Sequence, residues 1–159
     1  MLIRGRRPNE IFSLQYCLCP DQRDFAYALL QEYGVTGLEM ALGLFFSGTA
    51  SRYHPSSSEL AADLAALRHF GLELVSMQSL LFSTQDASLF AGDAARERLD
   101  EVLSQAINLA QMLAIPVLVF GLPRQRQIPP HTDPASAEII AIDFFRRLGE
   151  RLSAASTQI

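Results

Sequence analysis

A helix-like stretch runs into a small residue and then into an apolar strand at three points along this chain. The junction residues are Gly34, Gly71 and Ala114, so 37 residues separate the first two and 43 separate the last two. That spacing holds about one strand, one helix and two loops, and consecutive units of this kind build parallel sheets. Four units fit in the chain. Because a closed barrel needs eight, typically about 250 residues, the sequence predicts an α/β half barrel.

The expected strands are short apolar segments of the four units. They are Ile11–Tyr16, Gly37–Ala41, Glu73–Gln78 and Val117–Phe120. The last of these is apolar throughout, which is typical of a strand buried on both faces of a parallel sheet. We therefore expect residues 1–10 to form an N-terminal arm and residues 11–159 to form the four units, truncated after the fourth helix.

Amphipathic helices are expected between and after the strands. The first is predicted from Asp21 to Tyr33, with Phe25, Ala28 and Leu29 on one stripe. The third is the clearest, because its apolar residues recur at helical spacing and form a continuous face. That face consists of Leu99, Val102, Leu103, Ala106, Ala110 and Leu113.

The second and fourth helices carry start signals. Ser56 and Glu59 match a capping box, in which the hydroxyl and the carboxylate bond to free backbone amides of the first turn. Asp133 is followed by Pro134, which matches a helix cap followed by proline in the first turn. A backbone N–H has no partner within the helix at that position, so proline loses nothing there. The expected inner faces are Leu60, Leu64 and Leu67 in the second helix and Ile140, Phe144, Leu148 and Leu152 in the fourth. The long segment Gly43–Ser57 is predicted to be a functional loop.

Charge and composition exclude several functions. The net charge of −4 argues against a nucleic-acid partner, since such partners need clustered cations. No run approaches the roughly 18 apolar residues of a membrane span, and no signal peptide is recognisable. Cys17 and Cys19 lack disulfide geometry, and C-x-C alone lacks a second zinc-ligand pair. These features predict a soluble, cytoplasmic protein with no nucleic-acid or membrane partner.

Polar side chains at the carboxyl ends of the strands are the candidates for chemistry, because several loops converge there. They are Gln15, Tyr16, Glu39, Gln78, Ser79 and the segment 120–126. Glu39 is expected to face away from Leu38 and Met40 by strand alternation. A carboxylate there binds a metal or a hydroxylated ligand, or it bonds to a neighbouring loop or arginine.

Gln78 and two arginines complete the candidate set. The Gln78 amide can hold a sugar hydroxyl as both donor and acceptor, or it can satisfy loop backbone. Arg124 and Arg126 directly follow a strand, and a guanidinium there can clamp a phosphate or carboxylate. Arginines in loops are also commonly solvated surface groups. The shaped turn before them favours a functional role for Arg126 and leaves Arg124 open.

The spacing of the histidines and the motifs that the sequence lacks limit the possible reactions further. His54, His69 and His131 have no metal-ligand spacing. His69 falls in the last turn of the second helix, where the helix dipole favours a cation. His54 and His131 fall in loops, where either could act as an acid or base or have no role. Dinucleotide, P-loop and serine-hydrolase motifs are missing.

Four segments in order resemble one known family. They are Ile11–Gln15, Gly34-x-x-Gly37-Leu38-Glu39, Met77-Gln78-Ser79-Leu80-Leu81-Phe82 and Val119-Phe120-Gly121-x-Pro123-x-x-Arg126. Together they are similar to the sugar phosphate isomerase/epimerase family, the xylose isomerase-like barrels. The similarity runs from about Ile11 to Leu152, which is the N-terminal half of such a barrel.

The resemblance implies a (βα)₈ barrel that isomerises an aldose and ketose, or epimerises a sugar or sugar phosphate, by metal-assisted proton transfer. The divalent metal (Mg, Mn, Co or Zn) is held mainly from strands five to eight in this family. This chain has no such strands, so we expect no metal site and no activity from it alone. Gln15, Glu39, Gln78 and Arg126 would then shape the substrate side of the pocket.

Two other interpretations remain open. Four units would leave unpaired strand edges and exposed apolar surface, which predicts an oligomer or an interaction site. The chain could therefore be a non-catalytic, self-associating half-barrel module. It could also be a complete doubly wound, flavodoxin-like binding domain, with helices on both faces of the sheet and a ligand crevice where the strand order reverses.

Overall fold

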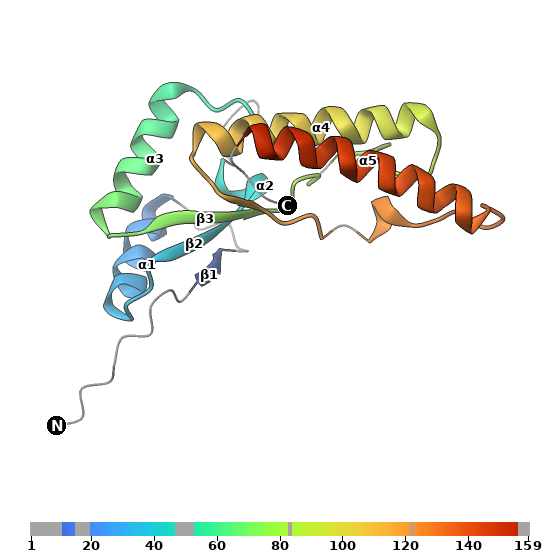
Figure 1. The fold of residues 1–159 in the computed structure, drawn as a ribbon. Coiled ribbons are helices and arrows are strands. Elements are labelled where there is room, and N and C mark those ends of the chain that lie inside the picture. The colour runs from blue at the N-terminus through green and yellow to red at the C-terminus, as the bar shows by residue number, and fades with distance from the viewer. Residues whose placement is uncertain (1–10, 15–19, 47–52, 83, 122, 156–159) are drawn as a thin grey trace.

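A computed structural model describes residues 11–14, 20–46, 53–82, 84–121 and 123–155 of the chain (Figure 1). Strands and helices alternate along it. The elements are β1 (Ile11–Leu14), α1 (Pro20–Glu32), β2 (Gly37–Ala41), α2 (Leu42–Phe45), α3 (Ser57–His69), β3 (Glu73–Gln78), α4 (Asp93–Met112), β4 (Val117–Leu118), the 3₁₀ turn η1 (Arg124–Arg126) and α5 (Pro134–Ala154). The predicted arm at residues 1–10 and the cysteines lie outside the described residues.

The strands form one parallel sheet in the order β1-β2-β3-β4, so each pairs with the next along the chain. Because parallel crossovers are right-handed, a sheet that always advances to the next strand carries its connecting helices on one face. A flavodoxin-like sheet instead reverses its strand order. The doubly wound alternative is therefore wrong, and the predicted half-barrel arrangement of parallel strand–helix units is confirmed.

The three sequence junctions are three copies of one helix-ending turn. Gly34, Gly71 and Ala114 all have left-handed backbone, with φ of 75°, 69° and 55°. In each copy the next residue is buried, and its N–H donates to a carbonyl five positions earlier. These bonds are Val35 to Leu30 at 3.0 Å, Leu72 to Leu67 at 2.9 Å and Ile115 to Ala110 at 2.8 Å. This turn ends a helix and starts the chain back toward the sheet.

The element boundaries differ from the predictions mainly at β4. β2 and β3 have the predicted bounds, whereas β4 contains only Val117 and Leu118. The Val119 N–H still donates to the Met77 carbonyl at 2.8 Å, which extends the β3–β4 ladder by one bond. The short helix α2 (Leu42–Phe45) overlaps the start of the segment Gly43–Ser57, which the sequence predicts to be a loop.

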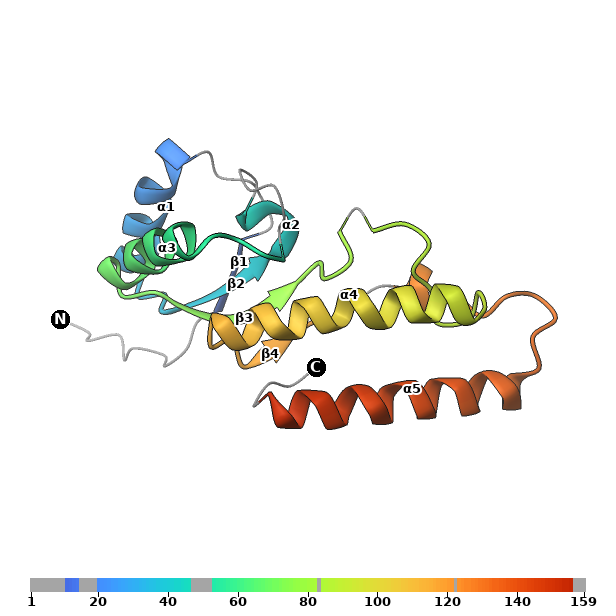
Figure 2. The same ribbon diagram turned by 90° about the horizontal axis from the view of Figure 1, so that it is seen from above.

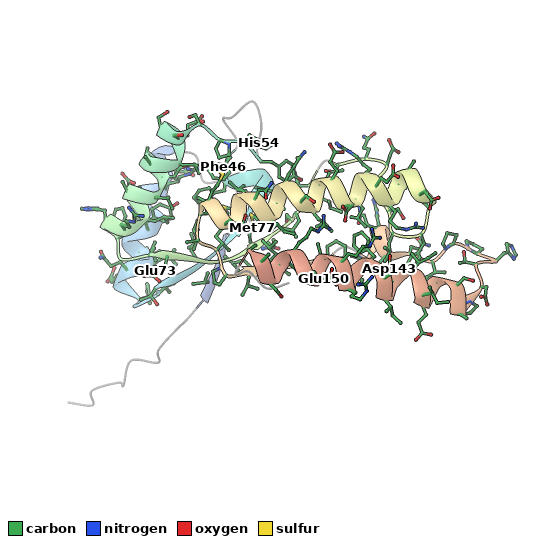
Figure 3. All side chains as sticks on the ribbon, turned by 45° about the horizontal axis from the view of Figure 1, so that its top comes forward. Phe46, His54, Glu73, Met77, Asp143 and Glu150 are labelled. Carbon is green, nitrogen blue, oxygen red and sulfur yellow. The ribbon has the colours of Figure 1, made fainter. Side chains whose placement is uncertain are left out.

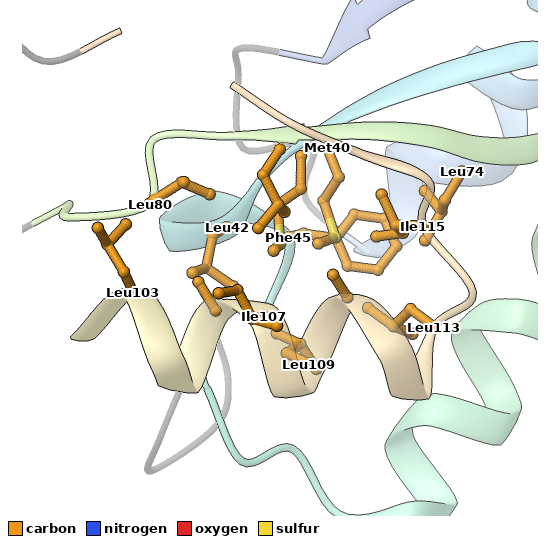
Figure 4. Close-up of a cluster of buried hydrophobic side chains, with 14 of the residues drawn as sticks. Met40, Leu42, Phe45, Leu74, Leu80, Leu103, Ile107, Leu109, Leu113 and Ile115 are labelled. Carbon is orange, nitrogen blue, oxygen red and sulfur yellow. The ribbon is translucent and has the colours of Figure 1, made fainter. Parts of the chain in front are cut away.

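The hydrophobic core lies between the sheet and the helices that cover it. Leu38, Met40, Met77 and Leu118 project from the strands into this core and are almost completely buried. Figure 4 shows α4 contributing Leu103, Ile107 and Leu109 beside Met40, Phe45 and Leu80. All six residues of the face predicted for this helix are buried. Burying each such leucine contributes about 1.5–3 kcal/mol to folding.

The stripe predicted on the first helix is exposed. Phe25 is 75% exposed and Leu29 43%, while Tyr27 and Leu30 form the buried side of α1. A similar contrast occurs on α5, where Phe144 is buried. The predicted inner residues Leu148 and Leu152 are also buried and Ile140 is half-buried, yet Ile139 and Ile142 project into solvent. Helices α1 and α5 therefore each carry a buried and an exposed apolar side.

Polar contacts fix the ends and mutual positions of the helices. The capping box at Ser56 and Glu59 is present, and Asp133 accepts a bond from the Ser136 N–H at 3.0 Å. Helices α4 and α5 run alongside each other, and Arg151 of α5 donates to both Asp100 carboxylate oxygens (Figure 2). Exposed ion pairs such as Arg146–Glu150, at 3.0 Å, connect residues of the same helix, α5.

Arg23 joins three helices at one point. Its guanidinium donates to the Phe45 carbonyl at 2.6 Å and to the Asp63 carboxylate at 3.2 Å. It also lies over the Phe45 ring, 5.3 Å from the centroid. Burial raises the pKa of Asp63, and Arg23 opposes this rise. Arg23 thus connects α1 to both α2 and α3.

Candidate functional site at the strand ends

Glu39 lies on β2 and faces away from the helices, as strand alternation predicts. Its neighbours Leu38 and Met40 are completely buried in the core, whereas Glu39 is half-buried on the opposite face. The Ser76 hydroxyl of β3 donates to Glu39 Oε2 at 2.8 Å. A carboxylate has about four acceptor positions, and the Ser76 bond occupies one of them and orients the Glu39 side chain.

Ser76 reaches Glu39 because of an irregularity in the sheet. Leu38 is aligned with Leu74, but Glu39 is aligned with Ser76, so β3 contains one extra residue at this point. A bulge of this kind re-aims the side chains that follow it. Ser76 is buried, and the sequence pattern alone did not single it out as a site residue. Its only signal was a hydroxyl between the apolar residues Val75 and Met77 of β3.

Gln78 ends β3 on the same side of the sheet as Ser76. It is aligned with Ala41, two positions along from the Glu39–Ser76 pair, and its side chain is half-buried. Neither Glu39 nor Gln78 is without an interaction partner. The structure therefore places Glu39, Ser76 and Gln78 on the face opposite the helices. Gln15 and Tyr16, the candidates at the first strand, lie outside the described residues.

A tyrosine that sequence reasoning missed also reaches the strand ends. The Tyr53 hydroxyl donates to the Leu80 carbonyl at 2.5 Å, which attaches the segment before α3 to the turn after β3. Ser79 starts that turn with left-handed backbone, φ 58°. Tyr53 lies in a loop without periodicity, so no sequence signal connected it to β3.

Arg126 does not join the Glu39 group. It lies on η1, which Figures 1 and 2 show beyond the carboxyl ends of the strands. The preceding Gln125 carbonyl accepts the Leu89 N–H at 2.8 Å, which ties this turn to the segment before α4. The exposed Arg126 guanidinium lies 5.7 Å from the centroid of the Phe120 ring. Arg124 is also exposed.

The histidines remain dispersed. His54 is exposed just before α3, at the edge of the molecule in Figure 3. His69 packs edge-on against Phe70, with centroids 4.9 Å apart, and the exposed His131 has left-handed backbone. Within the described residues, no group of three or more His, Cys, Asp or Glu side chains could hold a metal ion. None of the described helices has the length and apolar composition to cross a membrane.

A hollow of about 410 Å³ lies between α4 and α5, away from the strand ends. Charged residues such as Arg96, Asp100 and Arg147 line it, together with the Phe144 ring. Arg96 already pairs with Asp93 at 2.8 Å. The hollow is a groove between two packed helices, so we place the candidate site at the strand ends.

Solved structures similar to this fold include two sugar epimerases and a TIM barrel protein. D-psicose 3-epimerase, crystallised in the presence of D-fructose, is 12% identical, with a TM-score of 0.59 over 84% of this chain and 44% of its own. 3-Keto-D-glucoside 4-epimerase from E. coli, in its apo form, is 15% identical, with a TM-score of 0.58 over 94% of this chain and 54% of its own.

A third structure is a xylose isomerase-like TIM barrel protein from Mycobacterium smegmatis in complex with magnesium. It is 14% identical, with a TM-score of 0.51 over 89% of this chain and 46% of its own. No protein-family profile and no curated protein sequence match this chain. The chain spans about half the length of these structures, and its fold matches about half of a TIM barrel.

Proposed function

We propose that this chain is one half of a sugar isomerase or epimerase. In the complete barrel it would interconvert an aldose and a ketose, or epimerise a sugar or sugar phosphate, by metal-assisted proton transfer. Two sugar epimerases share its fold. The observation that carries the proposal is the Glu39–Ser76 bond on the face opposite the helices, because that face becomes the interior of a closed barrel.

The proposed roles follow from what each side chain can bond. The Glu39 carboxylate, oriented by Ser76, would accept a sugar hydroxyl, and the Gln78 amide would both donate and accept. Gln15 would join them at the end of the first strand. Arg126 would hold a phosphate, but only after its turn moves toward the strand ends, because η1 lies beyond them.

The metal and the catalytic residues are proposed to come from four further units. The described residues offer no group that could hold a metal ion, whereas one structure with this fold contains magnesium. A divalent metal in the complete barrel would polarise the sugar carbonyl. The boundary between an arm at residues 1–10 and the half barrel, and a cytoplasmic location, also remain predictions.

Sugar binding by this chain tests the proposal. We expect D-fructose, used as the probe, to shift the amide resonances of Glu39, Ser76 and Gln78 in two-dimensional NMR spectra. Glu39→Gln removes the charged acceptor and should weaken these shifts. Glu97→Gln changes an exposed carboxylate on α4 and serves as the matched control. Shifts confined to other residues, or shifts unaffected by Glu39→Gln, would contradict the assignment.

Turnover gives a second test. With D-fructose and Mg²⁺ we expect no isomerised or epimerised product from this chain alone, measured by chromatography of the sugars. Product that disappears in Glu39→Gln but persists in Glu97→Gln would show that this half carries catalytic groups. It would overturn the proposal that the catalytic residues come from further units.

A second candidate function is the non-catalytic, self-associating half barrel. The exposed apolar side chains on α1 and α5 favour it, since exposed apolar patches mark interaction sites. In that function the chain would form a scaffold without sugar chemistry. Absence of any D-fructose effect, together with a defined oligomer, would support this alternative over the first.

A further inference from the structure

The described sheet has an open edge at each end. Within the described residues, β1 pairs with β2 alone and β4 pairs with β3 alone. An edge strand presents free N–H and C=O groups that can pair with another strand. Both edges run in the same direction as the rest of the sheet, so a parallel strand could extend the sheet at either side.

The helix next to each open edge carries an exposed apolar stripe. On α1 the stripe is Phe25, Leu29 and Tyr33, and on α5 it is centred on Ile139 and Ile142. Figure 2 shows α1 and α5 at opposite ends of the row of helices. The buried sides of both helices already pack on the chain's own core. The helix at each end of the row therefore carries an exposed apolar stripe, on the same side of the molecule as an open strand edge.

We propose that two copies of this chain close one eight-stranded barrel through these surfaces. At each of two equivalent seams, β4 of one copy lies beside β1 of the other. The α1 stripe of one copy then packs against the α5 stripe of its partner. This inference specifies the second candidate function, the self-associating half barrel, and is an alternative to completion of the barrel by four further units. It rests on the half-barrel fold and not on the proposed sugar chemistry.

Strand number and symmetry favour a second copy as the partner. The described residues of each copy supply four parallel strands, and a closed barrel of this type needs eight. A twofold rotation about the barrel axis forms both seams at once and leaves no edge open, which gives a closed dimer. Pairing of β1 with its own copy would instead be antiparallel and would leave both β4 edges exposed.

The oligomeric state tests the proposal. Sedimentation and light scattering should give a mass of about 35 kDa, twice the 17.6 kDa of one chain. Phe25→Glu and Ile142→Glu should each weaken dimerisation by at least about a hundredfold, because each seam would bury an unpaired charge. Met112→Glu, an exposed apolar position on α4 outside both stripes, should leave the dimer intact.

A mixing experiment tests which surfaces meet. Phe25→Lys and Ile142→Glu should each be monomeric alone, yet form a dimer when mixed. In the mixed dimer one seam brings Lys and Glu together, and the other seam is unsubstituted. Circular dichroism should show the same helical content in every variant, since these side chains are exposed in the single copy.

Several outcomes would overturn the proposal. A monomer at every accessible concentration would show that a second copy does not cover these surfaces. A series of growing oligomers would show that the seams do not close. A dimer that tolerates Ile142→Glu but not Phe25→Glu would indicate pairing of the two α1 stripes. D-fructose binding, measured separately, bears on none of these results.

Discussion

Helices α4 and α1 have similar places in their strand–helix units, yet they differ in burial. The apolar face of α4 is buried along its length, including Leu99, Leu103 and Leu109. On α1, Tyr27 and Leu30 are buried while Phe25 and Tyr33 are each 75% exposed. Helix α4 lies inside the row of helices, and α1 lies at its end (Figure 2). The end helix α1 therefore keeps a stripe of apolar side chains exposed, whereas α4 buries the whole of its predicted face.

Two adjacent phenylalanines on α5 provide the strongest test of this comparison. Phe144 is 1% exposed and faces the core, whereas Phe145 is 36% exposed and packs edge-on against Phe120. Phe144→Ala should lower the free energy of unfolding by about 3–5 kcal/mol because it leaves a cavity. Phe145→Ala should cost about 1 kcal/mol. Urea denaturation of the single copy measures both, and equal losses would contradict the assigned faces.

The inner side of α1 is expected to hold this end helix in place. Arg23→Met removes the bonds to the Phe45 carbonyl and the Asp63 carboxylate, and should cost about 1.5–3 kcal/mol. Phe25→Ala, two residues away on the exposed stripe, should change stability by less than about 0.5 kcal/mol. Thermal unfolding at dilutions that keep the chain monomeric measures the stability loss of each variant. A larger loss from Phe25→Ala would mean that its stripe is covered within one copy.

The three helix-ending turns allow a smaller test with a predicted change of sign. Gly71→Ala should destabilise the protein by about 1 kcal/mol, because a side chain is strained in left-handed backbone. Ala114→Gly should relieve the same strain and stabilise by up to about 1 kcal/mol. A Cβ at Gly71 would have no atom within 4 Å, so the effect is one of backbone alone. Chemical denaturation that shows the same sign for both variants would contradict this account.

The smallest expected effects are pH dependences on α3. Hydrogen bonds from Ser56 lower the pKa of Glu59, so its contribution is present above the ordinary value of 4.5 and is lost as pH falls through the lowered pKa. Burial raises the pKa of Asp63, so its contribution is present below the ordinary value of 3.8 and is lost as pH rises through the raised pKa.

Melting temperatures between about pH 3 and 6 separate these two carboxyl groups. Glu59→Gln should reduce the loss of stability on the acid side. Asp63→Asn should reduce the loss that accompanies rising pH. The comparison fails if both substitutions change the pH profile in the same direction, because the two carboxyl groups would then share one environment.

Much of the fold could be predicted because its signals are local. The periodicity of α4, the capping box at Ser56 and the cap at Asp133 all depend on residues close in sequence, and all three are confirmed. The short helix α2 was missed because four residues carry too little periodic signal. The β4 strand was predicted too long, since apolar residues alone do not mark where pairing ends.

The candidate site was predictable only in part. Strand alternation placed Glu39 on the face away from the core, and the structure agrees. Its partner Ser76 depends on an extra residue in β3, which shifts the alignment between two strands 37 residues apart. Arg126 follows β4 closely in sequence, yet its turn packs beside the start of α4. Which of these residues bind a sugar remains a prediction.

The sequence by itself determined the bounds of β2 and β3 and the caps and turns that begin and end the longer helices, because caps, left-handed turns and apolar periods act over a few residues. Only the tertiary structure decided which apolar faces are buried, how Glu39 meets Ser76 and where the sheet is left open. Burial and alignment depend on neighbours that are distant in sequence. For that reason α1 and α4, both apolar along one side, differ in what covers them.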